Sequence, residues 1–333
     1  MSMKNFQKLI KETAEYVLEN LDNYILIGEN ISGKSELLYT IMNKCKQNPF
    51  YFIDSVNRSF HLNEISNYAK EKKEYDYREI IVMRMQDQTF NKNDSFGSAK
   101  IESIYWMYED RLKILVSEFL GLQVNIVIND NKNSPVIIPA RLEIEKGRNF
   151  EEQDNEKLNI SNGMQAVFRL FLELLFWEDN VKKNIAVDDK CIVFIEELDL
   201  YLSENYAAKI FNYIRKKFPQ FVFIISTHSR VLTVTAEETN VIAIKEMEKW
   251  IINGGESYEL DVEELFANIF FTEEALMHTN DNKIDRMLRI LLNNRINGAW
   301  SQLDKQMLDK INQKDLKPHQ HFVISEIEDW SYD

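Results

Sequence analysis

Short apolar runs alternate with longer amphipathic stretches along most of the 333-residue chain. In residues 6–21 apolar side chains recur at steps of three and four, which predicts an amphipathic helix. Residues 191–195 and 221–225 are short apolar runs bounded by polar residues, which predicts buried strands. A helix predicted at 206–218 joins these two strands, so they form a parallel crossover unit. This alternation of strand and helix indicates the α/β fold class.

The same patterns predict further elements. Residues 124–128 and 136–144 alternate around a polar turn, which predicts a hairpin. Other apolar or β-branched runs predict strands, and other periodic segments predict helices. The remaining predicted strands are 50–53 and 79–85, and the remaining predicted helices are 36–44, 100–120, 166–177, 284–293 and 300–311.

A glycine-rich loop follows the apolar run that begins at Ile25. Gly28, four further residues and then Gly33-Lys34-Ser35 have the full spacing of a phosphate-binding loop that opens a helix. Glycines let the backbone wrap closely around phosphate oxygens, the lysine reaches the β and γ phosphates, and the serine hydroxyl binds magnesium. The helix that follows directs its positive end at the anion. The loop therefore predicts a nucleoside triphosphate as the ligand.

Acidic side chains follow the predicted strand at 191–195. Glu196 and Glu197 come directly after it, and Asp199 lies two residues further on. An α/β sheet binds its ligand at the carboxyl ends of its strands. In P-loop proteins the first acid holds magnesium through water and the second orients the attacking water. The alternative is a strand that simply ends in solvated acids.

Two further polar segments lie near predicted strand or helix ends. Ser226-Thr227-His228-Ser229 follows the run at 221–225, and a histidine at that place can contact a γ-phosphate or can be purely structural. Ser161-Asn162-Gly163-Met164-Gln165 precedes the helix predicted at 166–177. Serine and glycine at a helix start form an anion site, whereas the simpler alternative is capping by Ser161 or Asn162.

Charge, hydropathy and cysteine content disfavour several classes of protein. A formal charge of −14 disfavours a nucleic-acid binder, because neutralising phosphates needs a basic face. The apolar runs are too short or too interrupted by charge to cross a bilayer, and residues 1–10 lack a secretory apolar block, so we expect a cytoplasmic protein. Two cysteines, Cys45 and Cys191, give no support for a disulfide framework or a zinc cluster.

Four segments, in this order, resemble the motifs of ABC-type ATPases. Residues 28–35 resemble Walker A, 161–165 the signature, 195–199 Walker B with the D-loop, and 226–229 the switch histidine. The chain resembles the subgroup that contains structural-maintenance-of-chromosomes, RecF and overcoming-lysogenization-defect (OLD) ATPases. The resemblance covers about residues 24–250 and implies a P-loop NTPase sheet of the ABC type.

The resemblance also implies a site shared by two protomers that are arranged head to tail. Ser161 and Gly163 of one protomer would close on the γ-phosphate held by Lys34 of the other. ATP and Mg²⁺ are the implied cofactors. The implied nucleotide-binding residues are Gly28, Asn30, Ser32, Gly33, Lys34, Ser35, Glu36, Ser161, Gly163 and Gln165. The implied catalytic residues are Glu197 and His228, and the implied metal-binding residues are Ser35, Gln86 and Glu196, with Gln88 as the alternative to Gln86.

Two departures from the family pattern affect these expectations. Glu196 stands where the family has aspartate, and we expect the longer side chain to slow or alter hydrolysis. The chain begins with the helix at 6–21 rather than with antiparallel strands that hold adenine, so the adenine contacts are unassigned. We expect an ATPase core at 1–95 and 150–269, an inserted helix-hairpin arm at 96–149 and a helical region at 270–333.

The leading functional expectation is an ATPase subunit whose nucleotide state controls a separate effector, a nuclease or toxin. It is similar to the ATPases of two-gene phage-defence systems such as PARIS or Septu. One alternative is a RecF-like ATPase that binds DNA ends, which the acidic charge disfavours. The other is an ATP-dependent scaffold with slow turnover.

Overall fold

The computed structural model places the elements of two compact units, Met1–Glu263 and Glu264–Asp333. The residues that the structure describes are 3–29, 32–45, 48–56, 58–68, 70, 74–86, 96, 100–128, 141–145, 160–184, 190–236, 239–245, 248–252, 262, 284, 287–288, 291–292, 295, 300, 302–309, 311 and 316–329.

A six-stranded sheet forms the centre of the first unit. Its strands are β1 (Tyr24–Gly28), β2 (Phe50–Ile53), β5 (Cys191–Ile195), β6 (Phe221–Ser226), β7 (Asn240–Lys245) and β8 (Glu248–Ile252). Their order is β2-β5-β6-β1-β7-β8, and all neighbours are parallel except β7 and β8. The predicted α/β class and the predicted parallel pairing of β5 with β6 are confirmed.

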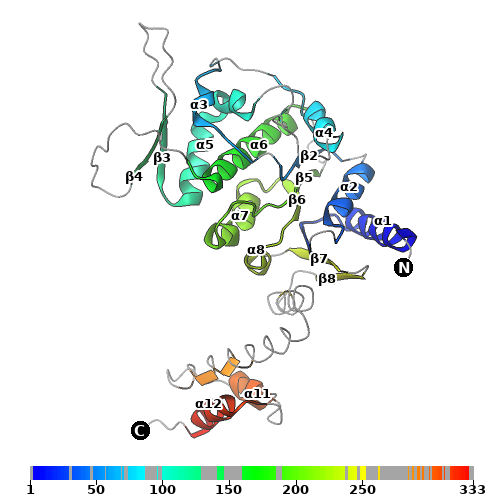
Figure 1. The fold of residues 1–333 in the computed structure, drawn as a ribbon, viewed down its shortest axis with the longest axis vertical. Coiled ribbons are helices and arrows are strands. Elements are labelled where there is room, and N and C mark those ends of the chain that lie inside the picture. The colour runs from blue at the N-terminus through cyan, green and yellow to red at the C-terminus, as the bar shows by residue number, and fades with distance from the viewer. Residues whose placement is uncertain are drawn as a thin grey trace. The chain divides into compact units, whose positions relative to one another are not determined.

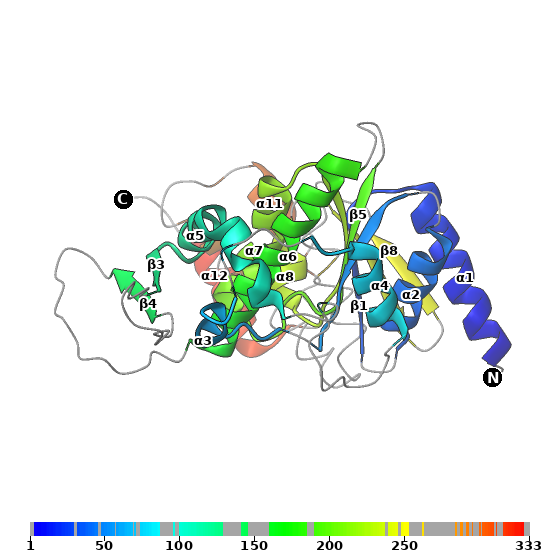
Figure 2. The same cartoon turned by 90° about the horizontal axis from the view of Figure 1, so that it is seen from above.

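Helices cover both faces of this sheet (Figures 1 and 2). On one face lie α1 (Met3–Glu19) and α2 (Lys34–Lys44), and on the other lie α5 (Tyr105–Leu120), α6 (Asn162–Asn184) and α7 (Glu204–Lys217). The other elements of the unit are α3 (Leu62–Ile65), α4 (Tyr77–Gln86), η1 (Ile101–Ile104), α8 (Arg230–Thr235) and the antiparallel pair β3 (Gln123–Val127) and β4 (Arg141–Glu145).

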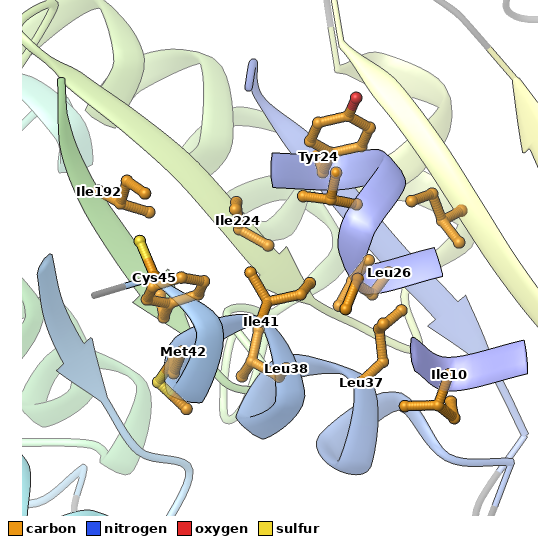
Figure 3. Close-up of a cluster of buried hydrophobic side chains, with 14 of the residues drawn as sticks. Ile10, Tyr24, Leu26, Leu37, Leu38, Ile41, Met42, Cys45, Ile192 and Ile224 are labelled. Carbon is orange, nitrogen blue, oxygen red and sulfur yellow. The ribbon is translucent and has the colours of Figure 1, made fainter. Parts of the chain in front are cut away.

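The pleat of the strands divides their side chains between the two helical layers. On the α1–α2 side, Leu26, Ile192 and Ile224 are each fully buried. Figure 3 shows the apolar stripe of α2, which includes Leu38 and Ile41, turned toward these strand residues. Burying one such aliphatic side chain contributes about 1.5–3 kcal/mol, so this layer fixes α2 firmly behind β1.

The opposite face of the sheet is rich in aromatic side chains. Tyr51 of β2 stacks on Trp177 of α6, with ring centroids 5.7 Å apart. Phe223 of β6 meets Phe211 of α7 edge to face. The first contact holds the long helix α6 against the edge of the sheet that carries β2, and the second holds α7 against β6.

One predicted strand is wrong. Residues 79–85 lie in helix α4, and not in a strand. The buried positions are Tyr77, Ile80, Ile81 and Arg84, which have the spacing of one helix face, whereas Val82 is exposed. Because one of these buried positions carries a charge, the helical period did not appear in the pattern of apolar residues. The other predicted helices and strands of this unit are confirmed where the structure describes them, and residues 136–140 lie outside the description.

A buried ionic cluster connects α4, β2 and α6. Arg84 is 4% exposed and pairs with Glu173 of α6 at 2.7 Å and with Asp54, after β2, at 3.3 Å. Glu173 also accepts hydrogen bonds from Tyr51 and from Arg169. Taking these charges out of water is costly unless each one is paired and hydrogen-bonded. The cluster therefore specifies how the three elements fit together.

The second unit has a small apolar core. Its described residues 284, 287, 288, 291 and 292 are helical, as predicted, and α11 (Gln302–Asp309) lies within the predicted helix at 300–311. A further helix, α12 (Pro318–Asp329), starts at a proline, which is favoured at a first helical position. The core consists of Leu288, Leu291, Ile311, Ile324 and Ile327. Among the described helices of the chain, none has the length and apolar content needed to cross a bilayer.

The ionic cluster yields a stability prediction. Arg84→Ala removes the buried cation that pairs with both Glu173 and Asp54, and we expect the free energy of unfolding in urea to fall by about 3–5 kcal/mol. Arg78→Ala, on the exposed side of the same helix, is the control and changes it by less than about 0.5 kcal/mol. Equal losses in the two variants would show that the cluster does not hold α4 in place.

Candidate functional site

The strand register brings the polar segments to one edge of the sheet. Ile53 lies beside Ile195, and Ile195 lies beside Ile225. On the other side of β6, Leu26 of β1 lies beside Ser226. The loop after β1 and the acids after β5 are therefore separated only by the end of β6. Ligands of parallel α/β sheets bind at this edge.

The glycine-rich loop needs both of its predicted glycines. Gly28 has φ +157° and Gly33 has φ +105°. A Cβ on Gly28 would lie 2.6 Å from the carbonyl oxygen of Ile244, and one on Gly33 would lie 2.4 Å from the ring of Phe6 in α1. Any larger residue would push the loop away from β7 or α1. Glycines thus let the backbone turn tightly into α2.

Lys34 is the first residue of α2, and its ammonium group folds back over the loop. It donates hydrogen bonds to the carbonyl oxygens of Gly28, at 2.9 Å, and Glu29, at 3.0 Å. Burial lowers the pKa of Lys34 from its ordinary value, while the charges of Glu197, Asp199 and Glu196 oppose that shift. An ammonium group has three donors, so after these two bonds one N–H is left for a phosphate oxygen.

The carboxylate of Glu196 lies between two serine hydroxyls. Ser35 donates to its Oε1 at 2.6 Å, and Ser55, just after β2, donates to its Oε2 at 3.0 Å. The buried guanidinium group of Arg58 donates to the Glu196 carbonyl oxygen at 2.6 Å. Both the side chain and the backbone of Glu196 are therefore held in place.

Glu197 has a strained backbone. Its φ is +50°, in the left-handed region that non-glycine residues rarely adopt. The Ser226 hydroxyl at the end of β6 accepts a hydrogen bond from its N–H at 3.0 Å, and its Oε1 lies 3.9 Å from Nε2 of His228. Such strain costs about 1–3 kcal/mol and clusters at functional sites. In this conformation the Glu197 carboxylate lies near the histidine.

His228 is about one third exposed and faces charges of both signs. Burial lowers its pKa below 6.5, and the positive charge of Lys34 lowers it further, whereas Glu197 and Asp199 oppose the shift. The imidazole is therefore neutral at pH 7. Thr227, beside it, donates to Asp199 and accepts from the N–H of Ser229, which fixes the turn that carries the histidine.

Lys34, Ser35, Glu197 and His228 line one cavity of 310 Å³. Its size suits the phosphate-bearing part of a nucleotide, and its wall combines a buried cation with a carboxylate and a neutral histidine. The lining residues are Phe6, Ser32, Gly33, Lys34, Ser35, Glu36, Glu197, Ser226 and His228. The structure thus places most of the predicted nucleotide and catalytic residues together.

The segment that resembles the signature lies at the start of α6. Ser161 caps the helix, because its hydroxyl accepts from the N–H of Met164 at 3.2 Å, as the simpler alternative predicted. A Cβ on Gly163 would lie 2.7 Å from the carbonyl oxygen of Tyr201. The side chain of Gln165 bonds the backbone of Ile160 and Phe60. None of the predicted residues of this segment lines the cavity at the phosphate-binding loop, as far as the chain is described.

Three predicted residues cannot be placed. Asn30 and the alternative Gln88 lie outside the described residues, and Gln86 ends α4 with its side chain outside the description. The expectation for Gln86 assumed a preceding strand, and that assumption is wrong. Sequence reasoning missed Ser55, Arg58 and Phe6. Only the position of Ser55, two residues after a predicted strand, could have pointed to it.

The donors present suit a hard divalent cation. The Ser35 hydroxyl and the Glu196 carboxylate supply oxygen atoms beside the place where the loop would hold phosphates, and Mg²⁺ is commonly bound by one or two carboxylates together with substrate phosphates. In the described part of the chain, no group of three or more His, Cys, Asp or Glu residues could hold a metal by itself. The residues therefore fit a cation that enters with a nucleotide.

No protein-family model matches the chain, and no curated protein matches it. The chain is similar to an Smc head bound to the C-terminal winged-helix domain of ScpA, at 12% identity and a TM-score of 0.30, covering 68% of this chain and 63% of that one. It is also similar to the SMC head domain from Thermotoga maritima, at 18% identity and a TM-score of 0.29, covering 46% of this chain and 51% of that one. A third similar structure is an inward-facing ABC transporter of the metal-chelate type. Its identity is 11% and its TM-score 0.36, covering 75% of this chain and 78% of that one. Because these scores are low, function must be argued from the residues of the chain itself.

The electrostatics of the cavity can be checked by titrating His228. In NMR we expect a pKa below 6.5, rising in Lys34→Ala, which removes a repelling cation, and falling in Glu197→Gln, which removes an attracting anion. Because folding lowers this pKa, the contribution of the neutral histidine to stability is present above pH 6.5 and is lost as the pH falls. Shifts of the same sign in the two variants would contradict the described arrangement.

Proposed function

We propose that the chain binds and hydrolyses ATP with Mg²⁺ at the cavity beside the phosphate-binding loop. One observation carries the proposal: the strand register gathers Lys34, Ser35, Glu197 and His228 around a single cavity. Phosphoryl transfer to water depends mostly on positioning and electrostatic stabilisation, and these are the groups that such a reaction needs.

The proposed roles follow from the chemistry of each group. Lys34 binds the β and γ phosphates, and the N–H groups at the start of α2 add partial positive charge. Ser35 and Glu196 hold the cation, which neutralises phosphate charge when it is bound. Glu197 orients a water molecule for in-line attack on the γ-phosphorus, as the bond to the β-phosphate oxygen breaks. The neutral His228 is placed to bond the γ-phosphate without adding charge.

The site is proposed to be one half of a composite site. The resemblance to ABC-type ATPases implies that Ser161 and Gly163 contact the γ-phosphate, yet neither residue lines the cavity of its own chain among the described residues. A second copy of the chain can supply them. A site completed only by association has little turnover in the separate protomer, which supports a slow or regulated ATPase.

Control of an effector is the finer part of the proposal. We propose that a nuclease or toxin responds to the nucleotide state of the chain, in the manner of phage-defence ATPases. The sequence resemblance supports this role, and the second unit has an apolar core of its own, as expected of a separate module. If the protein encoded beside this chain co-purifies with it in the presence of ATP but not ADP, the proposal gains support, and equal recovery in both would count against it.

Substitution of Lys34 and Glu197 tests the enzymatic proposal. Lys34→Ala removes the cation that binds the phosphates, and we expect no measurable ATP binding in calorimetry. Glu197→Gln keeps the shape but loses the charge that orients water, so ATP should bind as in the wild type while phosphate release falls by about 100-fold or more. Glu204→Gln, an exposed acid at the start of α7, is the control with wild-type rates. Normal turnover in Glu197→Gln would overturn the catalytic assignment.

A further inference from the structure

We propose that Ser55 is a ligand of the cation, beside Ser35 and Glu196. The inference rests on the proposed function and adds a residue that lies outside the phosphate-binding loop and the tandem acids. Ser55 belongs to the segment that follows β2, at the same edge of the sheet. It therefore joins the site through a different strand from the other two groups.

Ser35 and Ser55 make the same kind of contact with Glu196. Each hydroxyl donates its one hydrogen to Glu196, Ser35 to Oε1 at 2.6 Å and Ser55 to Oε2 at 3.0 Å. A serine hydroxyl has one hydrogen and two lone pairs, so each oxygen keeps lone pairs after donating. The two hydroxyls therefore bond the two different oxygens of one carboxylate. Oxygen groups from three segments of the chain thus meet at Glu196.

The segment around Ser55 is held from several sides. Asp54 accepts from the N–H of Val56 at 3.1 Å and pairs with the buried Arg84. Three residues beyond Ser55, the buried Arg58 bonds the Glu196 carbonyl oxygen. These contacts fix the backbone on both sides of Ser55 relative to Glu196. A hydroxyl held in this way is pre-organised rather than exposed on a mobile loop.

The coordination of Mg²⁺ leaves room for a third protein oxygen at this place. Mg²⁺ takes oxygen ligands in a near-octahedral arrangement, and the described residues supply only one carboxylate that bonds Ser35. Two hydroxyls add neutral oxygens without adding charge beside the phosphates. The longer side chain of Glu196, compared with aspartate, sets its carboxylate between the two serines. A cation site that includes Ser55 therefore explains both the glutamate at position 196 and the position of the Ser55 hydroxyl.

The test compares nucleotide affinity with and without the cation. ATP binding to the full chain is measured by calorimetry in Mg²⁺ and in EDTA. The dissociation constant in EDTA divided by that in Mg²⁺ gives the contribution of the cation. Ser55→Ala should reduce this ratio by about tenfold or more, because removing a metal-site partner commonly lowers metal affinity by about 10–100-fold. Binding in EDTA should stay as in the wild type, which also shows that the variant is folded.

Two further variants complete the design. Ser66→Ala is the control and should keep the wild-type ratio. Ser66 lies at the end of α3, and in the described contacts its hydroxyl bonds only the carbonyl oxygen of Asn63. Ser55→Cys replaces a hard ligand with a soft one, so Cd²⁺ should restore the ratio where Mg²⁺ does not. A wild-type ratio in Ser55→Ala, or equal behaviour of Ser55→Cys in the two metals, would overturn the inference. Absence of ATP binding by the wild type would overturn the proposed function as well.

Discussion

The arrangement of the site depends on how the Glu196 carboxylate is held. Its two oxygens accept hydrogen bonds from Ser35 at the start of α2 and Ser55 after β2, while its own strand is β5. One charged group thereby joins three segments that the sheet alone brings only near one another. A carboxylate is roughly twice as effective an acceptor as a neutral oxygen, so these bonds are strong. The loop and the acids keep their relative positions because of them.

Behind this carboxylate lies the buried ionic cluster around Arg84 and Glu173. It places α6 beside β2, and Arg58 connects the same region to the Glu196 backbone. Gln165, near the start of α6, bonds the N–H of Phe60 in the segment that also carries Ser55. The segment after β2 therefore contacts both Glu196 and the helix that begins with Ser161. A displacement of Glu196 would therefore also displace the start of α6, and the reverse.

Much of this arrangement could be predicted from the sequence, because the informative residues stand directly at the ends of regular elements. The spacing of Gly28, Gly33 and Lys34 demands one backbone shape, and Glu197 and His228 each follow an apolar strand closely. Continuous apolar runs located those strands, and the period of 3.6 residues located most of the helices. Parallel strands then brought the polar segments to one edge.

The parts that could not be predicted depend on long-range pairing of charges. Helix α4 was missed because its buried face includes Arg84, whose partner Glu173 is 89 residues away in sequence. Ser55 and Arg58 are ordinary polar residues until the register of β2 beside β5 places them against Glu196.

The central claim is that two chains share each ATP site. Its most direct test is the mass in solution of Glu197→Gln with ATP and Mg²⁺. The account predicts twice the 39.5 kDa of one chain, falling to one chain without nucleotide, whereas a single chain that carries bound ATP would contradict it.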